Sequence, residues 1–522
     1  MRPPSIPFQV IALAPFRHGE EKAWRHDPIR AEKTNIDQIM AELGVSLYIP
    51  LPENLCRLDG LELAFGKIRD FHPDTMAEKN PSLGKLLEAR QFVRQAKIEG
   101  HSAESIYIRL KDWPGLPMDL TFDPAQPKPP TPGLINDILK MVEIPGEIST
   151  SPGETGSFTD QIDRTLNRIV GHVFASEDFK RLESTWRGLK FLLSRGGFDG
   201  EVILKIVPVS SGSLEETLDS LLPGMIQDLP SLVIIDLPFD SSEPRLSLLE
   251  RVAAFSESLM APSLIWITPG FLSIDSWEDL SRLPFLPHHM EEHRFARWRK
   301  FRENPSARWI AATCNRLLSR YPYGPDNKTK NVRLTESQDG PWMSPVWALG
   351  SLIGQSLAKT GWPTRFAAWK DMRLLDLPLI AAKGTRNLAT EAHFSDDRID
   401  QFIRSGIIPL VAPFNKDLAF MPAETTAAGG SLAHQLFLSR ITHLIFWCRE
   451  NLGEDPEPGN IEQGLTKAFS LFWEKTGHPA PENLEISVVK PDPDKPAMAK
   501  ITIAPPKQIL PSGEKIELEF QW

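Results

Sequence analysis

The segment HHMEEH at 288–293 is the part of the sequence that comes nearest to a catalytic motif. His289, Glu292 and His293 fit the pattern H-x-x-E-H, in which two histidines on one helix face bind zinc and the glutamate acts as general base. The alternative is a polar helix start followed by ordinary surface charge, since no third ligand is evident later in the chain. We favour this alternative and expect no metal and no other cofactor.

Other motifs of catalysis or cofactor binding are missing. The sequence contains no G-x-x-x-x-G-K-[ST] phosphate loop, no G-x-G-x-x-G dinucleotide turn and no G-x-S-x-G nucleophile elbow. Asp236 follows a β-type run, which is where α/β folds often bind ligands. We interpret Asp236 instead as a cap of the turn DLPFDSSEP, and the sequence as a whole predicts a protein that is not an enzyme.

Length, charge and cysteine content limit the classes of protein to which the chain can belong. A chain of 522 residues suggests about two to four domains. The net charge of −10 and the lack of a long Lys/Arg run argue against nucleic-acid binding. Cys56, Cys314 and Cys448 are widely spaced and odd in number, as in a reduced compartment. No secretory signal and no apolar run of about eighteen residues is visible, so we expect a cytoplasmic protein without membrane insertion.

Residues 1–123 are predicted to form one compact α/β module. Its expected elements are strands at 8–16, 45–52 and 61–68 and a helix within 29–43. The composition then changes at 124–157, where DPAQPKPPTPG precedes a short helical stretch and a Gly/Ser/Thr-rich run. Successive prolines favour extended, semi-rigid chain, so this segment is predicted to be a linker between domains.

The segment 158–430 is predicted to be an α/β domain. Apolar residues at three- and four-residue steps, from Phe179 through Trp186 to Leu193, predict an amphipathic helix over 179–195. Three β-type runs follow at 201–209, 231–236 and 263–268, separated by helical stretches near 213–227 and 245–260. Strands separated by helices of this length favour a parallel or mixed sheet.

The segment 431–522 is predicted to be a C-terminal domain. Long helices are expected at 432–451 and 461–476, and three β-strands at 483–489, 497–505 and 515–522. Strands at a chain end expose an edge unless another strand pairs with them. The sequence leaves open whether these strands pair within the chain or with a neighbouring subunit.

Several motifs of the second half resemble the large subunit of the contractile sheath of type VI secretion systems. LESTWRGLKFLL resembles a helix near the start of that subunit, and FRENPSARWIAATCNRLLSRYPYG, a GW pair and TEAHFSDDRIDQFIRSGIIPL follow in the same order. The residues that carry this resemblance and are expected to serve assembly are Trp186, Arg187, Gly188, Arg302, Glu303, Arg308, Arg320, Tyr323 and Gly324.

The first hundred residues resemble the small subunit of the same sheath. In that family an Asp-Phe-x-Pro turn precedes a helix and then a Leu-Leu-x-x-Arg helix, as Asp70, Phe71 and Pro73 precede Arg90 here. The turn also has a local physical reason, because proline suits the first helical position and Asp70 or His72 can cap free amides. The resemblance thus indicates a small subunit fused to a large subunit.

The resemblance implies a multi-domain sheath fold whose terminal strands are available to neighbouring subunits. It implies a helical homopolymer around an inner tube, attached to baseplate components, that contracts to drive effector translocation. In that family a hexameric AAA+ unfoldase takes tubes apart by recognising a segment of the large subunit. The alternatives are a non-polymerising baseplate or adaptor paralogue and, through HHMEEH, a zinc metallohydrolase.

The arginines between 302 and 320 lie close to aromatic residues in the sequence. An arginine can stack on an aromatic ring and bind a carboxylate through two parallel hydrogen bonds. Such a group suits an interface between subunits and an ion pair within one domain equally well. The sequence leaves both possibilities open.

Overall fold

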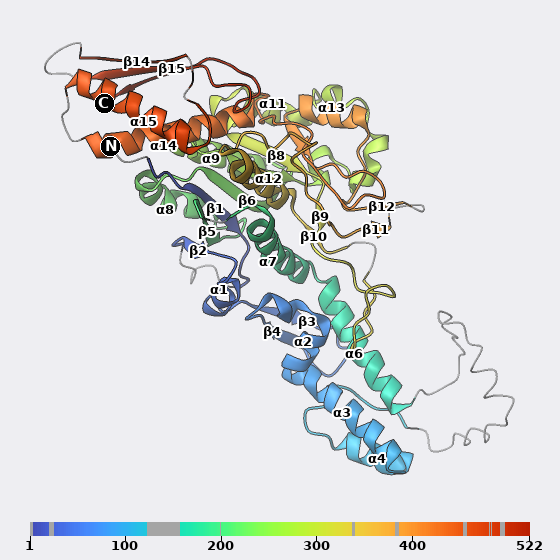
Figure 1. Cartoon of the computed structure of the whole chain (residues 1–522). Coiled ribbons are helices and arrows are strands. Elements are labelled where there is room, and N and C mark those ends of the chain that lie inside the picture. The colour runs from blue at the N-terminus through green and yellow to red at the C-terminus, as the bar shows by residue number, and fades with distance from the viewer. Residues whose placement is uncertain are drawn as a thin grey trace.

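The computed structural model describes residues 4–19, 26–122, 157–198, 200–336, 340–381, 386–452, 457–479, 481, 483–490 and 496–522. Apart from Ser157, the predicted linker at 124–157 and its short helix lie outside the described residues. The molecule is elongated, with a large sheet-containing part at one end and a narrower, mainly helical part at the other (Figure 1).

A central sheet organises the larger part. Among the described residues it contains seven strands in the order β13-β8-β7-β6-β1-β5-β2, parallel except for β2 at one edge. The strands are β1 (Phe8–Ala14), β2 (Ile29–Ala31), β5 (Val202–Pro208), β6 (Leu232–Phe239), β7 (Ser263–Ile267), β8 (Ile310–Cys314) and β13 (Ile407–Pro409). The predicted mixed α/β architecture, with its three consecutive β-type runs, is confirmed.

Strand β1 lies inside this sheet, between β5 and β6. Val10 is paired with Leu204 on one side and Leu232 on the other. All seven residues of β1 are buried, which is typical of a parallel strand covered on both faces. The expectation that residues 1–123 form a compact module of their own is therefore wrong for β1 and β2. The boundaries proposed at 123, 157 and 430 stay a prediction.

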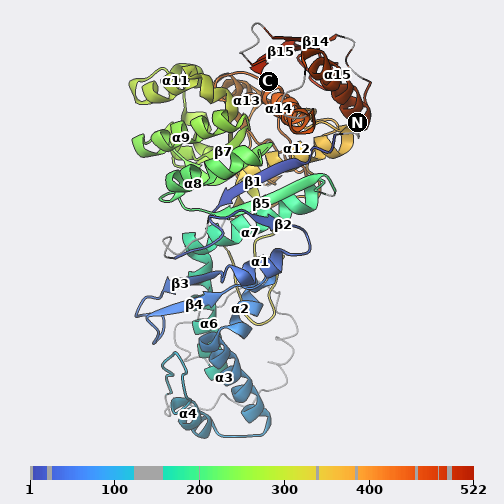
Figure 2. The ribbon, with the colours of Figure 1, turned by 90° about the vertical axis from the view of Figure 1, so that its left-hand side faces the viewer.

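Helices cover both faces of the sheet (Figure 2). Val10 and Ala12 contribute to the core beneath α7 (Glu177–Arg195) and α12 (Pro345–Thr360). Ile11 and Leu13 contribute to the core beneath α8 (Leu214–Gln227) and α9 (Glu243–Leu259). Successive side chains of a strand point to opposite faces, so the apolar run Val10–Ala14 of β1 is explained by these two cores.

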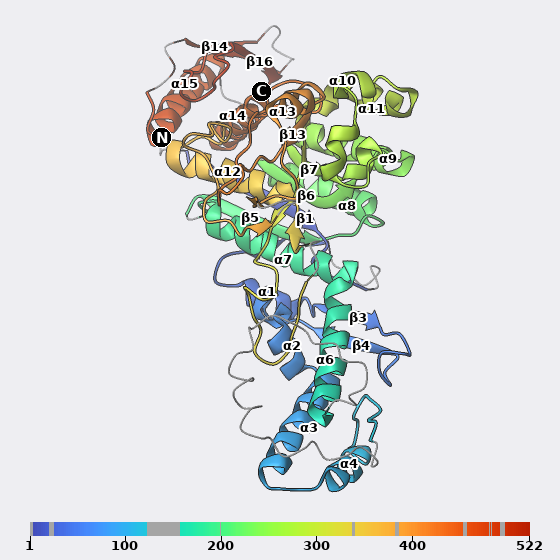
Figure 3. The same ribbon diagram turned by 90° about the vertical axis from the view of Figure 1, so that its right-hand side faces the viewer.

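The narrower part, called the helical lobe here, combines the rest of the first segment with α6. It contains α1 (Ile36–Glu42), the hairpin of β3 (Ser46–Pro50) and β4 (Gly60–Ala64), α2 (Pro73–Lys79), α3 (Pro81–Ile98), α4 (Ala103–Lys111) and α6 (Phe158–Ala175). Helix α6 runs beside α3 (Figure 3). The helix predicted within 29–43 is present as α1, which begins at Ile36 after Asn35. The preceding Ile29–Ala31 pairs with β5.

The C-terminal segment packs above the sheet. It contains α14 (Leu432–Leu452), α15 (Pro458–Lys475) and an antiparallel sheet in which, within the described part, β15 (Met498–Ile503) lies between β14 (Leu484–Val489) and β16 (Ile516–Gln521). Both termini lie at this end of the molecule (Figure 1). Lys475 donates to the Pro4 carbonyl and Arg440 to the Ile6 carbonyl, which fixes the chain ahead of β1.

Shorter elements connect these parts. They are β9 (Leu317–Leu318), β10 (Trp342–Met343), β11 (Ile380–Ala381), β12 (Asn387–Leu388), α10 (Leu286–His289), α11 (Ala296–Glu303), α13 (Asp396–Arg404) and the 3-10 helices η2 (Ile68–Phe71), η3 (Pro269–Leu272), η4 (Trp277–Arg282), η5 (His293–Phe295) and η6 (Pro305–Trp309). Among the described residues, no helix has the length and apolar character needed to cross a membrane.

The central position of β1 predicts that the second segment cannot fold without the first. Residues 158–522 expressed alone would lack the strand between β5 and β6, so we expect an insoluble or non-cooperatively unfolding product. Co-expression with residues 1–122 should restore a soluble complex, because β1 is held between β5 and β6 by backbone hydrogen bonds that need no covalent link. Soluble yield and urea unfolding are the measurements. Cooperative unfolding of 158–522 alone, as stable as the whole chain, would contradict this expectation.

Candidate functional site

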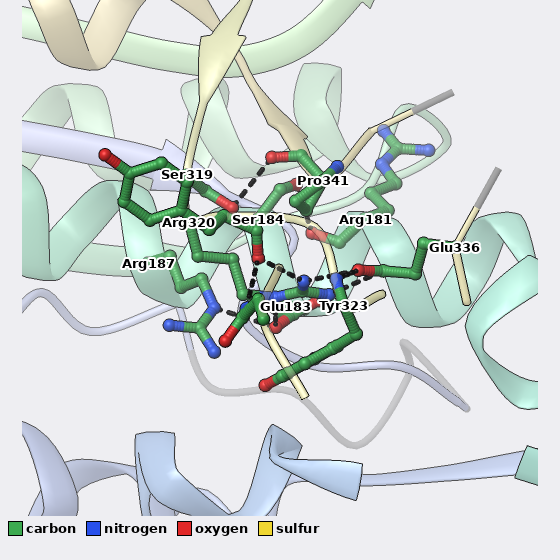
Figure 4. Close-up of polar contacts among 11 residues, drawn as sticks. Arg181, Glu183, Ser184, Arg187, Ser319, Arg320, Tyr323, Glu336 and Pro341 are labelled. Atoms are coloured by element: carbon green, nitrogen blue, oxygen red, sulfur yellow. Dashed lines mark hydrogen bonds and ion pairs between the residues drawn. The ribbon is translucent and has the colours of Figure 1, made fainter. Parts of the chain in front are cut away.

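Four charged side chains, Glu183, Arg187, Arg320 and Glu336, form a buried ion cluster (Figure 4). Arg320 donates from Nε to Glu183 Oε1 at 2.8 Å and from Nη1 to Glu336 Oε2 at 2.6 Å. Its Nη2 also donates to Glu183 Oε2 at 3.1 Å and to Glu336 Oε1 at 2.7 Å. Arg187, one turn after Glu183 on α7, donates to Glu183 Oε1 at 2.7 Å.

The cluster balances two positive and two negative charges away from water. Burial alone would raise the pKa of the Glu183 carboxyl, but Arg320 and Arg187 hold that pKa below its ordinary value. Burial alone would lower the pKa of the Arg320 guanidinium, but Glu183 and Glu336 raise it. The Arg320 guanidinium also lies 4.3 Å from the centre of the Tyr323 ring. Arg320 therefore forms its ion pairs within the chain. Of the two possibilities that the sequence left open for it, a subunit interface or an internal ion pair, the structure shows the second.

The bridging loop, residues 320–336, joins this cluster to the helical lobe. Asp74, in the first turn of α2, accepts hydrogen bonds from the backbone amides of Lys330, Asn331 and Val332 at 2.8, 2.8 and 3.2 Å. Arg90 of α3 donates to the Asn331 carbonyl at 2.6 Å and to Asp163 of α6 at 2.9 Å. The loop therefore fastens α2, α3 and α6 to α7 through charged groups.

Asp74, Glu183 and Glu336 were not among the predicted site residues. Asp74 follows Pro73 directly, but an acidic residue in a first helical turn ordinarily indicates only a favourable helix dipole. Glu183 lies three residues before the predicted Trp186, on an amphipathic helix, where a charged residue is ordinarily exposed. Nothing in the local sequence indicates that these groups meet across hundreds of residues.

The predicted residues of the first segment have local structural roles. Asp70 accepts from the amides of Gly66 and Lys67 at 3.0 and 3.1 Å and pairs with Lys79 at 2.6 Å. Phe71 stacks on Phe65 with the ring centres 4.3 Å apart. Pro73 is the first residue of α2, and His72 Nδ1 accepts from the Asp74 amide, as the turn chemistry predicts.

The predicted residues of α7 hold the helix against the sheet and α12. Trp186 donates from Nε1 to the Phe16 carbonyl at 3.1 Å, just beyond β1. Gly188 lies beneath Trp347 so closely that an added Cβ would be 2.3 Å from the indole nitrogen. Glycine at this position permits the close approach of α7 and α12, whereas Arg187 belongs to the ion cluster.

The remaining predicted residues are dispersed. Arg302 of α11 donates to the Ala427 and Arg404 carbonyls at 2.8 and 3.2 Å, and Glu303 is exposed. Arg308 pairs with Glu257 of α9 at 3.6 Å and lies over the Trp309 ring. Tyr323 is buried under Arg320, and Gly324 exchanges two 3.2 Å backbone hydrogen bonds with Asn327 in a tight turn. The structure thus brings Arg187, Arg320 and Tyr323 together but not Arg302, Glu303 or Arg308.

The HHMEEH segment does not form the helix that its zinc-binding pattern requires. Helix α10 ends at His289, and His293 begins a 3-10 helix. His289 is buried, with Nδ1 2.8 Å from Glu292 Oε1, while His293 is exposed. Among the described residues, no group of three or more His, Cys, Asp or Glu side chains is placed to hold a metal ion.

The structure also differs from the expectation that Asp236 caps the turn after its strand. It is buried within β6, where its Oδ2 accepts from Trp347 Nε1 at 2.9 Å and Thr185 Oγ1 at 3.4 Å. Burial raises the pKa of this carboxyl. The turn after β6 is capped instead by Asp240, which accepts from the Ser242 amide at 2.8 Å. The interpretation of Asp236 as a turn cap is wrong because β6 extends to Phe239.

The three C-terminal strands pair with one another, which leaves the outer edges of β14 and β16 outside the ladders described. Trp522 donates its amide to the Ala497 carbonyl at 2.8 Å, which fixes the register of the hydrogen bonds. Because these bonds alternate in an antiparallel pair, the amides of Glu517 and Glu519 point outward from β16. By the same alternation the amides of Ile486 and Val488 point outward from β14. Both edges offer donors to an additional strand.

The family model for VipB, described as EvpB/VC_A0108, tail sheath N-terminal domain, matches residues 157–223 and 230–428. The chain belongs to this family. The family model described as Type VI secretion system, VipA, VC_A0107 or Hcp2, matches residues 3–107. The predicted order of a small-subunit-like part followed by a large-subunit-like part is therefore confirmed, and the chain is a VipA–VipB-type structural sheath protein of type VI secretion.

The chain is also similar to individual proteins and solved structures. The VipA–VipB-type chain is 24% identical over 352 residues to the type VI secretion system sheath protein TssC1 of Pseudomonas aeruginosa, spanning 60% of this chain and 68% of that protein. Among solved structures it is similar to a chain of the anti-feeding prophage baseplate, with 11% identity, a TM-score of 0.37 and 65% and 76% of the two chains covered. It is also similar to a chain of the contracted helical sheath of the anti-feeding prophage, with 12% identity and a TM-score of 0.35. That match covers 64% of this chain and 77% of the other.

Removal of one cation from the ion cluster is predicted to destabilise the VipA–VipB-type chain strongly. Arg320→Ala leaves Glu183 and Glu336 without their shared partner, so we expect a loss of about 3–5 kcal/mol in unfolding free energy. Arg282→Ala is the control, since the Arg282 side chain is 80% exposed and its removal should change stability by less than about 0.5 kcal/mol. Urea unfolding measures both. Equal stabilities of the two variants would show that the cluster contributes nothing.

The lowered pKa of Glu183 predicts a definite pH dependence. Its carboxyl is ionised in the folded chain at a pH where the unfolded chain, with the ordinary value of 4.5, already binds a proton. Its contribution is thus complete above pH 4.5 and is lost as the pH falls through the lower folded pKa. The stability difference between the wild type and Glu183→Gln should shrink over that interval. A difference that is constant from neutral to acidic pH would contradict this assignment.

Proposed function

We propose that copies of this chain polymerise into a helical sheath around an inner tube, and that contraction of the sheath drives effector translocation. The observation that carries this proposal is the union of VipA-type and VipB-type segments around one sheet, with β1 of the first segment between β5 and β6 of the second. One chain would then supply a whole sheath protomer. The relative named as a sheath protein in Pseudomonas aeruginosa supports the same role.

Neighbouring copies would be joined by strand addition at the C-terminal sheet. The outward amides of β14 and β16 are the groups that an extra strand would bind. Such backbone hydrogen bonds depend little on side chains, so subunits could move relative to one another without separating. The β16 edge carries exposed Glu517 and Glu519, and charged residues at an edge limit unspecific pairing.

Contraction would release free energy held in contacts between copies, and the chain would act without catalysis of its own. The partners we propose are further copies of itself, the inner tube protein and baseplate components, in the cytoplasm. A AAA+ unfoldase is a further proposed partner for disassembly. In this chain the segment at 124–157 takes the place of the large-subunit N-terminus, so recognition by an unfoldase would use another exposed segment.

Electron microscopy of the purified full-length chain, alone and with its inner tube protein, tests the proposal. We expect long striated tubes. Discrete small oligomers would instead indicate a baseplate or adaptor paralogue, and a stable monomer at high concentration would contradict polymerisation.

Proline substitution tests strand addition without disturbing the fold. Val488→Pro and Glu519→Pro each remove an outward amide while leaving every hydrogen bond to β15 in place. We expect at least one of them to abolish tubes while the unfolding transition of the monomer stays nearly unchanged. Val488→Thr and Glu519→Gln keep the amide and should assemble normally. Normal tubes from both proline variants would contradict strand addition at these edges.

A further inference from the structure

The order of strands in the central sheet reverses beside β1. From β1 the chain proceeds to β5 on one side, whereas β6, β7, β8 and β13 follow on the other. In doubly wound sheets the loops after two such strands separate and leave a crevice at the carboxyl ends, where ligands commonly bind. In this chain the order reverses between β1 and β6. A second crevice lies beside that point, between the end of β1, the end of β5 and the first turns of α7.

A recess of about 260 Å³ is present at this crevice. It is lined by residues from three separate parts of the chain. The loop after β1 contributes Pro15, Arg17, His18 and Gly19, helix α7 contributes Asp178, Arg181 and Leu182, and the loop after β5 contributes Ser210. No role in sheath assembly has been assigned above to this recess.

The lining is predominantly cationic. Arg17 and Arg181 approach it from different elements, with His18 beside them and Asp178 as the carboxylate of the described lining. Arg181 lies two residues before Glu183, but its side chain is directed away from the ion cluster (Figure 4). Among the described residues its guanidinium has no hydrogen bond or ion pair, although Asp236 and Asp178 lie within electrostatic range. Arg181 lines both this recess and a neighbouring one that contains Asp236, and no described partner holds its guanidinium.

The loop after β5 is folded in advance for such a role. The Ser210 amide donates to Ser213 Oγ at 3.0 Å, and the Gly212 amide donates to Ser210 Oγ at 3.0 Å. Ser213 precedes α8 without capping it, so the first amides of that helix keep their partial positive charge near the recess. Gly19, on the opposite wall, has φ +115° and no atom within 4 Å of the place a Cβ would take. The backbone there is open to a bound group.

We propose that this recess binds a phosphate-type oxyanion, either inorganic phosphate or the phosphate monoester of a small molecule. Arg181 would contribute a pair of parallel N–H groups, Arg17 a second charge and Ser210 a hydroxyl donor. The recess is larger than a phosphate group. Water, or the organic part of a monoester, would fill the rest of the recess. Binding would stabilise the folded chain, because the ligand contacts α7 and the loops after β1 and β5 together.

Calorimetric titration of the full-length chain with inorganic phosphate and with ribose 5-phosphate tests this site. We expect saturable binding of at least one of them, with tighter binding of ribose 5-phosphate if the natural ligand is a monoester and equal or weaker binding if it is free phosphate. Arg181→Ala should weaken the binding about tenfold or more, since a charged hydrogen-bonding group is lost. Arg181→Lys should give an intermediate affinity, because it keeps the charge but not the planar fork.

Arg282→Ala provides the matched control, as it removes an exposed arginine far from the recess in sequence and should leave the titration unchanged. Arg181 is exposed, so its variants should fold normally, which their unfolding transitions will verify. Absence of saturable binding of either probe at millimolar concentration would overturn the proposal. An unchanged affinity in Arg181→Ala would do so equally, since the observed binding would then lie elsewhere.

Discussion

The pairing of β1 with a strand on each side is the constraint on which the rest of the structure depends. Phe8–Ala14 lies between Val202–Pro208 and Leu232–Phe239, and its side chains enter the cores on both faces of the sheet. Two sequence segments that match different family models therefore share one hydrophobic core. Their physical union is made by backbone hydrogen bonds and apolar burial, and the covalent connection at 123–156 is additional.

Charged contacts extend this union from the sheet to the helical lobe. The Glu183–Arg320–Glu336 contacts begin on α7, directly below the sheet, and the bridging loop ends on Asp74 and Arg90 in the helical lobe. A balanced buried cluster tolerates little displacement, because separating one ion from its partners leaves an uncompensated charge. The cluster and the bridging loop therefore hold the helical lobe firmly against α7, at the opposite end of the molecule from the edges of β14 and β16.

The sequence was informative where a single periodic signal decides the structure. The largely apolar β1 run, the three β-type runs that became β5, β6 and β7, and the 3.6-residue period of α7 predicted elements that are present. Periodicity does not say which sheet a strand enters, so the assignment of β1 to a separate module was wrong. The three-residue strand β2 is too short to have a detectable period, and it was not predicted.

Site residues were harder to predict than elements. Asp70 and Pro73 act through neighbours a few residues away, and their roles follow from turn chemistry. Asp74, Glu183 and Glu336 act across the fold, and their partners become visible only when the bridging loop is placed beside α2 and α7. Asp236 was wrongly interpreted as a turn cap for a related reason, since a buried carboxyl within a strand has no local sequence signature. Local chemistry is thus readable from the chain, and long-range charge pairing is not.

Hydrogen exchange of the β1 amides tests the shared core most directly. If β1 is a central strand of one cooperative unit, Val10 and Leu13 should exchange only through global unfolding, with the same opening free energy as β6 residues such as Ile234 and the same dependence on denaturant. Exchange of the β1 amides at a clearly lower free energy than those of β6 would show that the first segment detaches by itself, and would contradict the account.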